Sequence, residues 1–284
     1  MPVAWATSGL RANCALARAA SARNSNQVKV YALQFDLAWE NPPANFAKVR
    51  SLLAKAPPEA GALVALPELF ATGFSMNTPV VAEQRGGATE QFLAALASEY
   101  GITVVGGVAI RGSDGNCRNQ AVAFSSSGER ICEYTKMRPF TPGLEHQHYV
   151  AGERPVVFPW GGCSVAPFIC YDLRFPELFR MAARMAQPEL FVVIANFPEK
   201  RIAHWVRLLQ ARAIENQAYV VGVNRVGDDP FYNYNGRSLI VDPHGEVLAD
   251  AGNTEGVIQA DLDLDQLVKY RTGLPFLKDL WPTE

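Results

Sequence analysis

The chain has 284 residues, of which 49% are hydrophobic and 19% are charged, a composition typical of globular proteins rather than disordered or fibrous ones. Its formal net charge is −2, which argues against a broad basic surface for nucleic acid or for anionic lipid. We therefore expect the partner to be a small molecule or a second copy of the chain.

The first 27 residues differ in composition from the rest of the chain. They contain Arg11, Arg18 and Arg23 but no acidic residue, as organelle transit peptides do. A flexible extension or a start codon placed too far upstream would look the same, and we favour these two interpretations over targeting. The folded sequence is expected to run from Val28 to Glu284 as one domain, because no linker-like stretch interrupts it.

From residue 28 onward, segments typical of strands alternate with segments typical of helices. Residues 28–37 alternate in polarity as a strand does. Residues 42–56 place apolar side chains at helical spacing behind two prolines, which suit a helix start. The apolar run 61–68 has the length of a buried strand. Residues 89–101 predict a helix with Thr89 as its N-terminal cap and Gly101 at its end.

The same alternation continues to the end of the chain. The further predicted strands are 102–110, 117–126, 131–136, 163–170, 189–197, 219–226, 237–242 and 257–262. The further predicted helices are 176–186, 204–218 and 264–271. The last two strands are expected to flank the turn 243–246. This pattern predicts an α/β fold in which two mixed sheets pack face to face and helices cover each outer side.

The cysteines indicate the redox environment. The chain has five, an odd number without a Cys-x-x-Cys pair, so neither a zinc site nor a thioredoxin-like motif is expected. They are Cys14, Cys117, Cys132, Cys163 and Cys170. Unpaired cysteines in a chain long enough for a full core are typical of a reducing compartment, and we expect a cytoplasmic protein. No apolar run approaches the roughly 18 residues that a membrane-spanning helix needs.

Several side chains capable of chemistry come at or just after predicted strand ends, where α/β proteins bind ligands. They are Glu68, Lys136, Glu145 and Cys170. Cys170 could attack a carbonyl or nitrile carbon while Glu68 takes the thiol proton. Lys136 would keep the thiolate accessible and, with the main-chain N–H of Tyr171, would hold the developing oxyanion. Taken singly, each of these residues is as easily explained as a structural or surface residue.

Three sequence stretches, taken together, resemble the nitrilase superfamily of carbon–nitrogen hydrolases. They are LPELFATGF from residue 66, YTKMRPF from residue 134 and ICYDLRFPE from residue 169, each at the close of an apolar strand. The resemblance extends over nearly all of residues 28–282. It implies an α-β-β-α sandwich that needs no cofactor, with Glu68 as general base, Lys136 as oxyanion stabiliser and Cys170 as nucleophile. Glu145 corresponds to a second glutamate that positions the substrate amide and helps to orient the lysine.

Within this superfamily, GLEHQHYVAG from residue 143 and ANFPEKRIAHW from residue 195 look most like the ω-amidase branch. The resemblance implies hydrolysis of the terminal amide of 2-oxoglutaramate, 2-oxosuccinamate or succinamate, each of which carries a carboxylate. A buried carboxylate needs a cation or hydrogen-bond donors. The candidate cations are Arg174, Arg201 and Arg237, and the sequence does not choose among them. The aromatic residues that could wall the pocket, or belong to the core, are Phe74, Phe197 and Trp205.

Other interpretations stay open from the sequence. The enzyme could be a deaminated glutathione amidase, an aliphatic amidase, a carbamoylase or a nitrilase, or it could be a catalytically silent metabolite-binding scaffold. A papain-like hydrolase is disfavoured because the local cysteine signature is absent. No metal site is expected, since His146 and His148 lack partners at ligand spacing. The resemblance also implies a homodimer formed through the helix 176–186. An ordinary helix that packs an apolar stripe against the core would show the same apolar residues.

Overall fold

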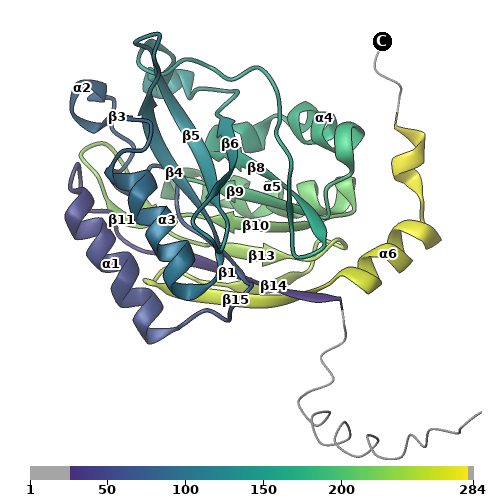
Figure 1. Ribbon diagram of the computed structural model, residues 1–284. Coiled ribbons are helices and arrows are strands. Elements are labelled where there is room, and N and C mark those ends of the chain that lie inside the picture. Colours follow the sequence, from purple (N-terminus) through teal and green to yellow (C-terminus); the bar gives the residue numbers. More distant parts are fainter. Residues whose placement is uncertain (1–25, 281–284) are drawn as a thin grey trace, which may run out of the picture.

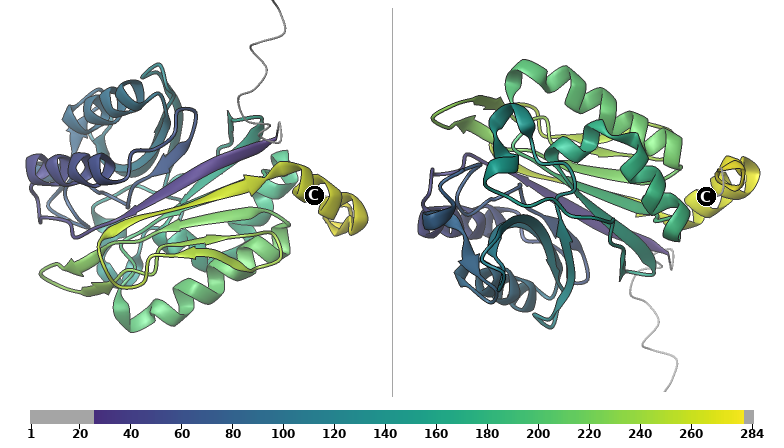
Figure 2. Two further views of the ribbon diagram at one scale, coloured as in Figure 1. Left: turned by 90° about the horizontal axis from the view of Figure 1, so that it is seen from below. Right: turned by 90° about the horizontal axis from the view of Figure 1, so that it is seen from above.

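The computed structural model describes residues 26–280 and centres on two β-sheets that pack face to face, with helices on both outer sides (Figures 1 and 2). The first sheet has the strand order β15-β1-β2-β4-β5-β6, with β3 paired to β4. The second sheet has the order β14-β13-β10-β9-β8-β7, and β11 pairs with β12 as a separate hairpin. The α-β-β-α sandwich expected from the sequence is confirmed.

The elements have the following bounds. The strands of the first sheet are β1 Gln27–Gln34, β2 Leu63–Ala65, β3 Glu83–Gln84, β4 Thr103–Arg111, β5 Cys117–Phe124, β6 Arg130–Thr135 and β15 Gly256–Asp263. The others are β7 Phe158–Trp160, β8 Cys163–Ile169, β9 Leu190–Ile194, β10 Tyr219–Val223, β11 Val226–Asp228, β12 Asn233–Asn235, β13 Leu239–Val241 and β14 Val247–Asp250. The α-helices are α1 Pro42–Lys55, α2 Thr78–Val81, α3 Ala88–Tyr100, α4 Pro176–Ala186, α5 Ile202–Asn216 and α6 Leu264–Gly273.

Alternation along the strands divides the side chains of the first sheet between two cores. In β1, Val30 and Ala32 belong to the core shared with the second sheet, whereas Tyr31 and Leu33 belong to the core under α1 and α3. Successive side chains of a strand point to opposite faces, so one strand can serve both layers. On the other side of the molecule, α4 and α5 cover the second sheet (Figure 2).

Two local predictions are wrong. The turn 243–246 joins β13 to β14, and β15 instead pairs antiparallel with β1 in the first sheet. β14 is mostly exposed, so it carries no apolar alternation that would have revealed it. At the start of α3, Gly87 is the cap, and Thr89 lies in the first turn. Thr89 donates from its main-chain N–H and its hydroxyl to the carboxylate of Glu83 rather than capping the helix itself.

The strands that carry Glu68 and Lys136 end at one common edge of the first sheet. β2 is parallel to β4, β5 is antiparallel to β4, and β6 is antiparallel to β5, so β2 and β6 run in the same direction. Glu68 comes three residues after β2, and Lys136 directly follows β6. In the second sheet β8 and β9 are parallel, and Cys170 directly follows β8.

The remaining predictions about the chain as a whole concern its beginning and its relation to membranes. β1 begins at Gln27, one residue before the expected start of folded sequence. Residues 1–25 of the predicted extension lie outside the described residues. Within residues 26–280, no helix has the length and apolar character needed to cross a membrane.

Candidate active site

The main chain around Glu68 is placed by a close contact with β4. Leu69 has a positive φ of 45°, which bends the chain sharply after the glutamate. Gly107 of β4 lies directly against this bend: a Cβ added to it would be 2.3 Å from the Leu69 nitrogen and 2.7 Å from the Glu68 Cα. Only a glycine lets the two segments approach so closely. Gly107 therefore helps to position Glu68. The sequence places Gly107 in a predicted strand and did not reveal this role.

The Glu68 carboxylate is completely buried and accepts hydrogen bonds from three neighbours. Lys136 Nζ lies 2.8 Å and Asn119 Nδ2 2.7 Å from Glu68 Oε1. The main-chain N–H of Asn196 donates to Oε2 at 2.9 Å. These donors hold the carboxylate in one orientation and stabilise its charge inside the protein.

Glu145 lies on the other side of the lysine. Its Oε2 is 2.8 Å from Lys136 Nζ and also accepts from the main-chain N–H of Phe140 at 2.5 Å, while Asn119 Nδ2 donates to its Oε1 at 2.9 Å. Burial lowers the pKa of Lys136, but the carboxylates of Glu145 and Glu68 outweigh this effect and raise it above its ordinary value. The buried lysine is therefore a fixed positive charge between two carboxylates.

Cys170 lies at a strained turn between β8 and a short 3-10 helix, Cys170–Arg174. Its φ is 46°, a conformation that residues other than glycine rarely adopt. The Cys170 Sγ donates to the main-chain oxygen of Asn196 at 3.7 Å. The chain therefore turns sharply after β8, and the turn directs the sulfur toward the end of β9.

The thiol is not stabilised as a thiolate at rest. Burial and the negative charge of Glu68 raise the pKa of Cys170 well above its ordinary value, and the opposing charge of Lys136 is too small to offset them. The positive charge of Lys136 acts on the thiol in the expected direction, because it lowers the pKa of Cys170, but burial and Glu68 act against it. A base must take the thiol proton when the cysteine reacts.

Two asparagines complete the cluster, and sequence analysis missed both. Asn119, on β5, donates to Glu68 and Glu145 together. Asn196 follows β9 and contacts both Glu68 and Cys170 through its main chain. Asn119 is a polar residue inside the apolar predicted strand 117–126, and Asn196 stands near the end of the predicted strand 189–197. Both signals are weak unless it is known which strands pair.

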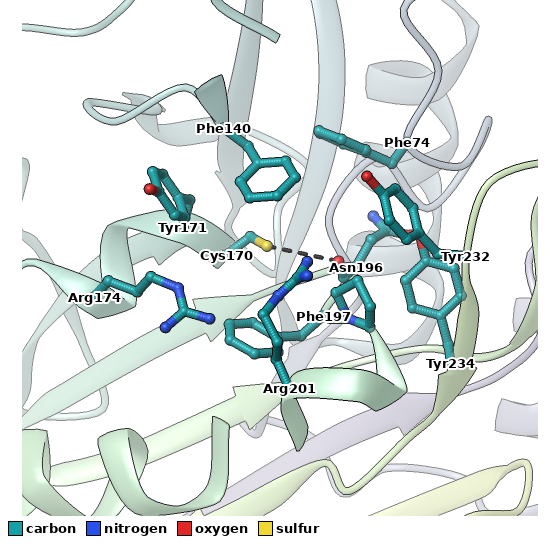
Figure 3. Close-up of a pocket in the computed structure, with 11 residues that line it drawn as sticks. Phe74, Phe140, Cys170, Tyr171, Arg174, Asn196, Phe197, Arg201, Tyr232 and Tyr234 are labelled. Atoms are coloured by element: carbon teal, nitrogen blue, oxygen red, sulfur yellow. Dashed lines mark hydrogen bonds between the residues drawn. The ribbon is translucent and has the colours of Figure 1, made fainter. Parts of the chain in front are cut away.

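A small pocket opens onto the cysteine, and Figure 3 shows the residues around the sulfur. Its cavity volume is about 20 Å³, roughly the room that one water molecule needs. The pocket is lined by Phe74, Phe140, Cys170, Tyr171, Arg174, Asn196, Phe197, Pro198, Arg201, Tyr232 and Tyr234. Of the residues predicted to form the pocket, Phe74, Tyr171, Arg174 and Phe197 are therefore found in its wall.

The pocket contains two cations. Arg174 Nη1 lies 3.2 Å from His204 Nδ1, and the Arg201 guanidinium lies 5.4 Å from the centre of the Phe140 ring. Within residues 26–280 neither arginine forms an ion pair with an aspartate or a glutamate. Burial and the positive charge of Arg201 lower the pKa of Arg174. An anion bound between the two guanidinium groups would relieve their mutual repulsion.

Two predicted pocket residues lie elsewhere. Trp205 is completely buried behind Phe197, with ring centres 5.3 Å apart, and its Nε1 donates to the main-chain oxygen of Arg237. Arg237 is paired with Asp250 at 2.7 Å and does not line the pocket. Both residues come from segments near the site, but packing turns their side chains away from it.

The described part of the chain contains no group of three or more His, Cys, Asp or Glu side chains that could hold a metal ion. His146 lies in a short 3-10 helix, Glu145–Gln147. The side chains that the structure brings together at the site are the half-buried thiol of Cys170, the buried carboxylates of Glu68 and Glu145, and the buried ammonium of Lys136.

Comparisons with known proteins give the following matches. The family model of carbon–nitrogen hydrolases matches residues 18–272. The chain is 36% identical over 250 residues to a 2-oxoglutaramate amidase from Bacillus subtilis, covering 87% of this chain and 95% of that protein. It is 37% identical over 256 residues to the ω-amidase YafV from Yersinia enterocolitica, covering 89% and 96%. The crystal structure of XC1258 from Xanthomonas campestris, a CN-hydrolase superfamily protein, aligns with a TM-score of 0.84 at 31% identity, covering 91% and 98%.

Proposed function

The chain belongs to the carbon–nitrogen hydrolase family and is a hydrolase that acts on amides, and from this we propose that it is an ω-amidase. Its substrates would be small dicarboxylate monoamides such as 2-oxoglutaramate, 2-oxosuccinamate and succinamate, which it would convert to the dicarboxylate and ammonia. The observation that carries this proposal is the presence of Arg174 and Arg201 in the pocket of Cys170.

The two arginines favour a substrate that carries a carboxylate away from its amide. Transfer of a carboxylate from water into a protein pocket is unfavourable unless charged donors receive it. Arg174 and Arg201 offer such donors, and neither is paired with an acidic side chain within residues 26–280.

In the proposed mechanism Cys170 is the nucleophile and Glu68 the base. Glu68 takes the thiol proton as the sulfur attacks the amide carbon, and Lys136 Nζ with the main-chain N–H of Tyr171 stabilises the oxyanion. Glu68 then gives its proton to the leaving nitrogen, and ammonia departs from a Cys170 thioester. Water, deprotonated by Glu68, attacks the thioester carbon, and the acid leaves as the thiol is restored.

The raised pKa of Cys170 supports general-base catalysis rather than a stored thiolate. A neighbouring carboxylate raises the thiol pKa while it remains charged, and it is also the group that can accept the proton. Glu145 would keep the lysine in place without exchanging a proton with the substrate, since it accepts hydrogen bonds from Lys136, Asn119 and the Phe140 N–H.

A pair of matched substrates tests this proposal. Succinamate and butyramide carry the same amide on a chain of the same length, but butyramide has a methyl group where succinamate has its carboxylate. We expect succinamate to have the higher kcat/KM by roughly 10- to 100-fold, the equivalent of about 1.5–3 kcal/mol for charge-assisted hydrogen bonds. Equal rates would indicate an aliphatic amidase instead, and turnover of a carbamoyl amino acid or a nitrile in the same panel would indicate those rival activities.

We also propose that α4 forms a homodimer contact. Its outer face carries Met181 and Met185, which are 39% and 55% exposed. Exposed methionines on one helix face are suited to an interface because their side chains adapt to the partner surface.

A further inference from the structure

A buried carboxylate, Asp172, joins the two chain segments that carry the proposed nucleophile and the lysine. Its Oδ2 accepts from the main-chain N–H of Ile169 at 3.0 Å and from the hydroxyl of Tyr134 at 2.8 Å. Its Oδ1 accepts from the main-chain N–H of Arg138 at 2.9 Å. Asp172 itself is completely buried.

The positions of these donors matter more than their number. Ile169 directly precedes Cys170, and Asp172 comes two residues after it, so the carboxylate closes the turn around the sulfur-bearing residue. Tyr134 and Arg138 lie two residues on either side of Lys136. One side chain therefore fixes the nucleophile turn and the lysine segment relative to each other.

The turn needs such a restraint. Cys170 has a φ of 46°, and a non-glycine residue held in the left-handed region costs on the order of 1 kcal/mol or more. The surrounding structure must therefore stabilise this conformation. The hydrogen bond from Ile169 to the side chain of Asp172 supplies a local restraint, and the bonds to Tyr134 and Arg138 anchor it to the first sheet.

The buried position of Asp172 is unfavourable for a charged carboxylate. Burial raises the pKa of Asp172 to about 7, although the positive charge of Lys136 and the three hydrogen bonds act in the opposite direction. Burial and the Asp172 charge together raise the pKa of Tyr134 well above its ordinary value, so the phenol stays protonated and donates. Hydrophobic residues surround the site in the central core, where an apolar side chain would have been easier to bury.

We propose that Asp172 is a positioning residue that sets the sulfur of Cys170 in register with Lys136 and Glu68. The inference rests on the proposed thiol mechanism. It assigns Asp172 no contact with the substrate and no proton transfer. Its effect is expected in the rate of the chemical step, because a displacement of about 1 Å between reacting groups can lower a rate by roughly 100-fold.

The test is Asp172→Asn, which keeps the size of the side chain but presents an amide N–H₂ to at least one of the main-chain donors. We expect kcat for succinamate, per folded site, to fall by about 100-fold, and KM to change by less than about threefold because the arginines remain. Folded sites are counted from the amplitude of the thermal unfolding transition. The matched control is Tyr134→Phe, which removes one hydrogen bond of three and should lower kcat by roughly three- to tenfold.

The outcomes separate this inference from the proposed function. If Asp172→Asn stays folded and keeps kcat within about threefold of the parent, the positioning role is wrong. If the loss of total activity equals the fraction of unfolded protein, the role of Asp172 is purely structural. If Asp172→Asn does not fold, the Tyr134→Phe protein is used as the test instead. An unchanged kcat of that protein overturns the anchoring role of Asp172. Failure of the parent to hydrolyse succinamate while it hydrolyses another amide overturns the substrate proposal, and Asp172 is then tested with that amide.

Discussion

The ammonium nitrogen of Lys136 lies 2.8 Å from a carboxylate oxygen of Glu68, and both side chains are almost completely buried. A buried pair of this kind does not by itself stabilise a fold, because desolvation of both charges offsets their attraction. Its presence at the end of two strands, beside a thiol, is better explained by chemistry. Each group also has a second partner, Glu145 for the lysine and the Asn196 N–H for the glutamate.

Glu68→Gln tests the base. The amide retains the size of the side chain but cannot accept the thiol proton, so we expect kcat to fall by roughly 10³- to 10⁴-fold, toward the upper end of what general-base catalysis contributes. KM should change little, because Arg174 and Arg201, which are proposed to hold the substrate carboxylate, remain in the pocket. Ammonia release from succinamate gives the rates, and the thermal midpoint shows whether Lys136, still paired with Glu145, tolerates the change. Activity above a tenth of the parent value would rule out Glu68 as the base.

The raised pKa of Cys170 predicts how its alkylation depends on pH. Only the thiolate reacts, so the rate of reaction with iodoacetamide should rise by about tenfold per unit from about pH 7 to about pH 9, without a plateau. The Cys170→Ala protein provides the background, and it should release no ammonia while its unfolding transition is preserved. A plateau reached below neutral pH would show a stabilised thiolate and would contradict the effect of burial on the thiol pKa.

Alkylation of Cys170 in the Glu68→Gln protein tests whether the charge of Glu68 acts on the thiol. The negative charge of Glu68 raises the pKa of Cys170, whereas Lys136 lowers it. Once the carboxylate charge is removed, less charge opposes the effect of Lys136 on the thiol. The pKa of Cys170 should therefore fall, and alkylation at neutral pH should become faster. Faster labelling together with slower catalysis would separate thiol acidity from proton transfer. Slower labelling would mean that Glu68 does not act on the sulfur through its charge.

Much of this site could be predicted from the sequence because three of its members follow apolar strands. Glu68, Lys136 and Cys170 each stand where a run of buried residues stops, and the strand directions bring Glu68 and Lys136 to one edge of the first sheet. Asn119 could not be predicted in the same way. It lies inside β5, and its role depends on which strands pair with β5 and on the packing of the loop after β6.

The choice among the three arginines was also beyond the sequence. Arg174 and Arg201 reach the pocket because the segments after β8 and β9 meet there, whereas Arg237 is drawn to Asp250 on the neighbouring strand β14. Such outcomes depend on contacts between residues far apart in the chain. The hairpin of β11 and β12, which supplies Tyr234 to the pocket wall, was missed because its strands have three residues each.

Gly107→Ala tests the placement of Glu68 by β4. The added methyl group would lie against main-chain atoms of Glu68 and Leu69, which cannot move without shifting the carboxylate, so we expect a loss of roughly 1–3 kcal/mol in unfolding free energy and a clear fall in kcat. Gly106→Ala is the matched control, since its methyl group would meet side-chain atoms of Leu93 and Phe70 at 3.0 and 3.2 Å. Equal kcat values for the two variants would show that the contact with Glu68 has no special role.

Met181→Glu combined with Met185→Glu tests the proposed homodimer contact. Two charges on the exposed face of α4 should oppose burial of that face against a second copy. We expect the parent to behave as a dimer and the double variant as a monomer in sedimentation velocity. Val268→Glu is a matched control, because Val268 is an equally exposed apolar residue on α6, at 58% exposure. A parent that sediments as a monomer, or a double variant that stays dimeric, would contradict the proposed contact.

Replacement of the arginines one at a time tests how the substrate carboxylate is recognised. Arg174→Gln and Arg201→Gln should each lower kcat/KM for succinamate by roughly 10- to 100-fold, mainly through KM, because the lost charge contacts a part of the substrate that does not react. Turnover of butyramide should be nearly unchanged, since it has no carboxylate to lose a partner. Arg237→Gln is the matched control, because Arg237 is paired with Asp250 outside the pocket. If Arg174→Gln and Arg201→Gln slow both substrates equally, these arginines shape the pocket rather than bind the carboxylate, and the ω-amidase proposal loses its main support.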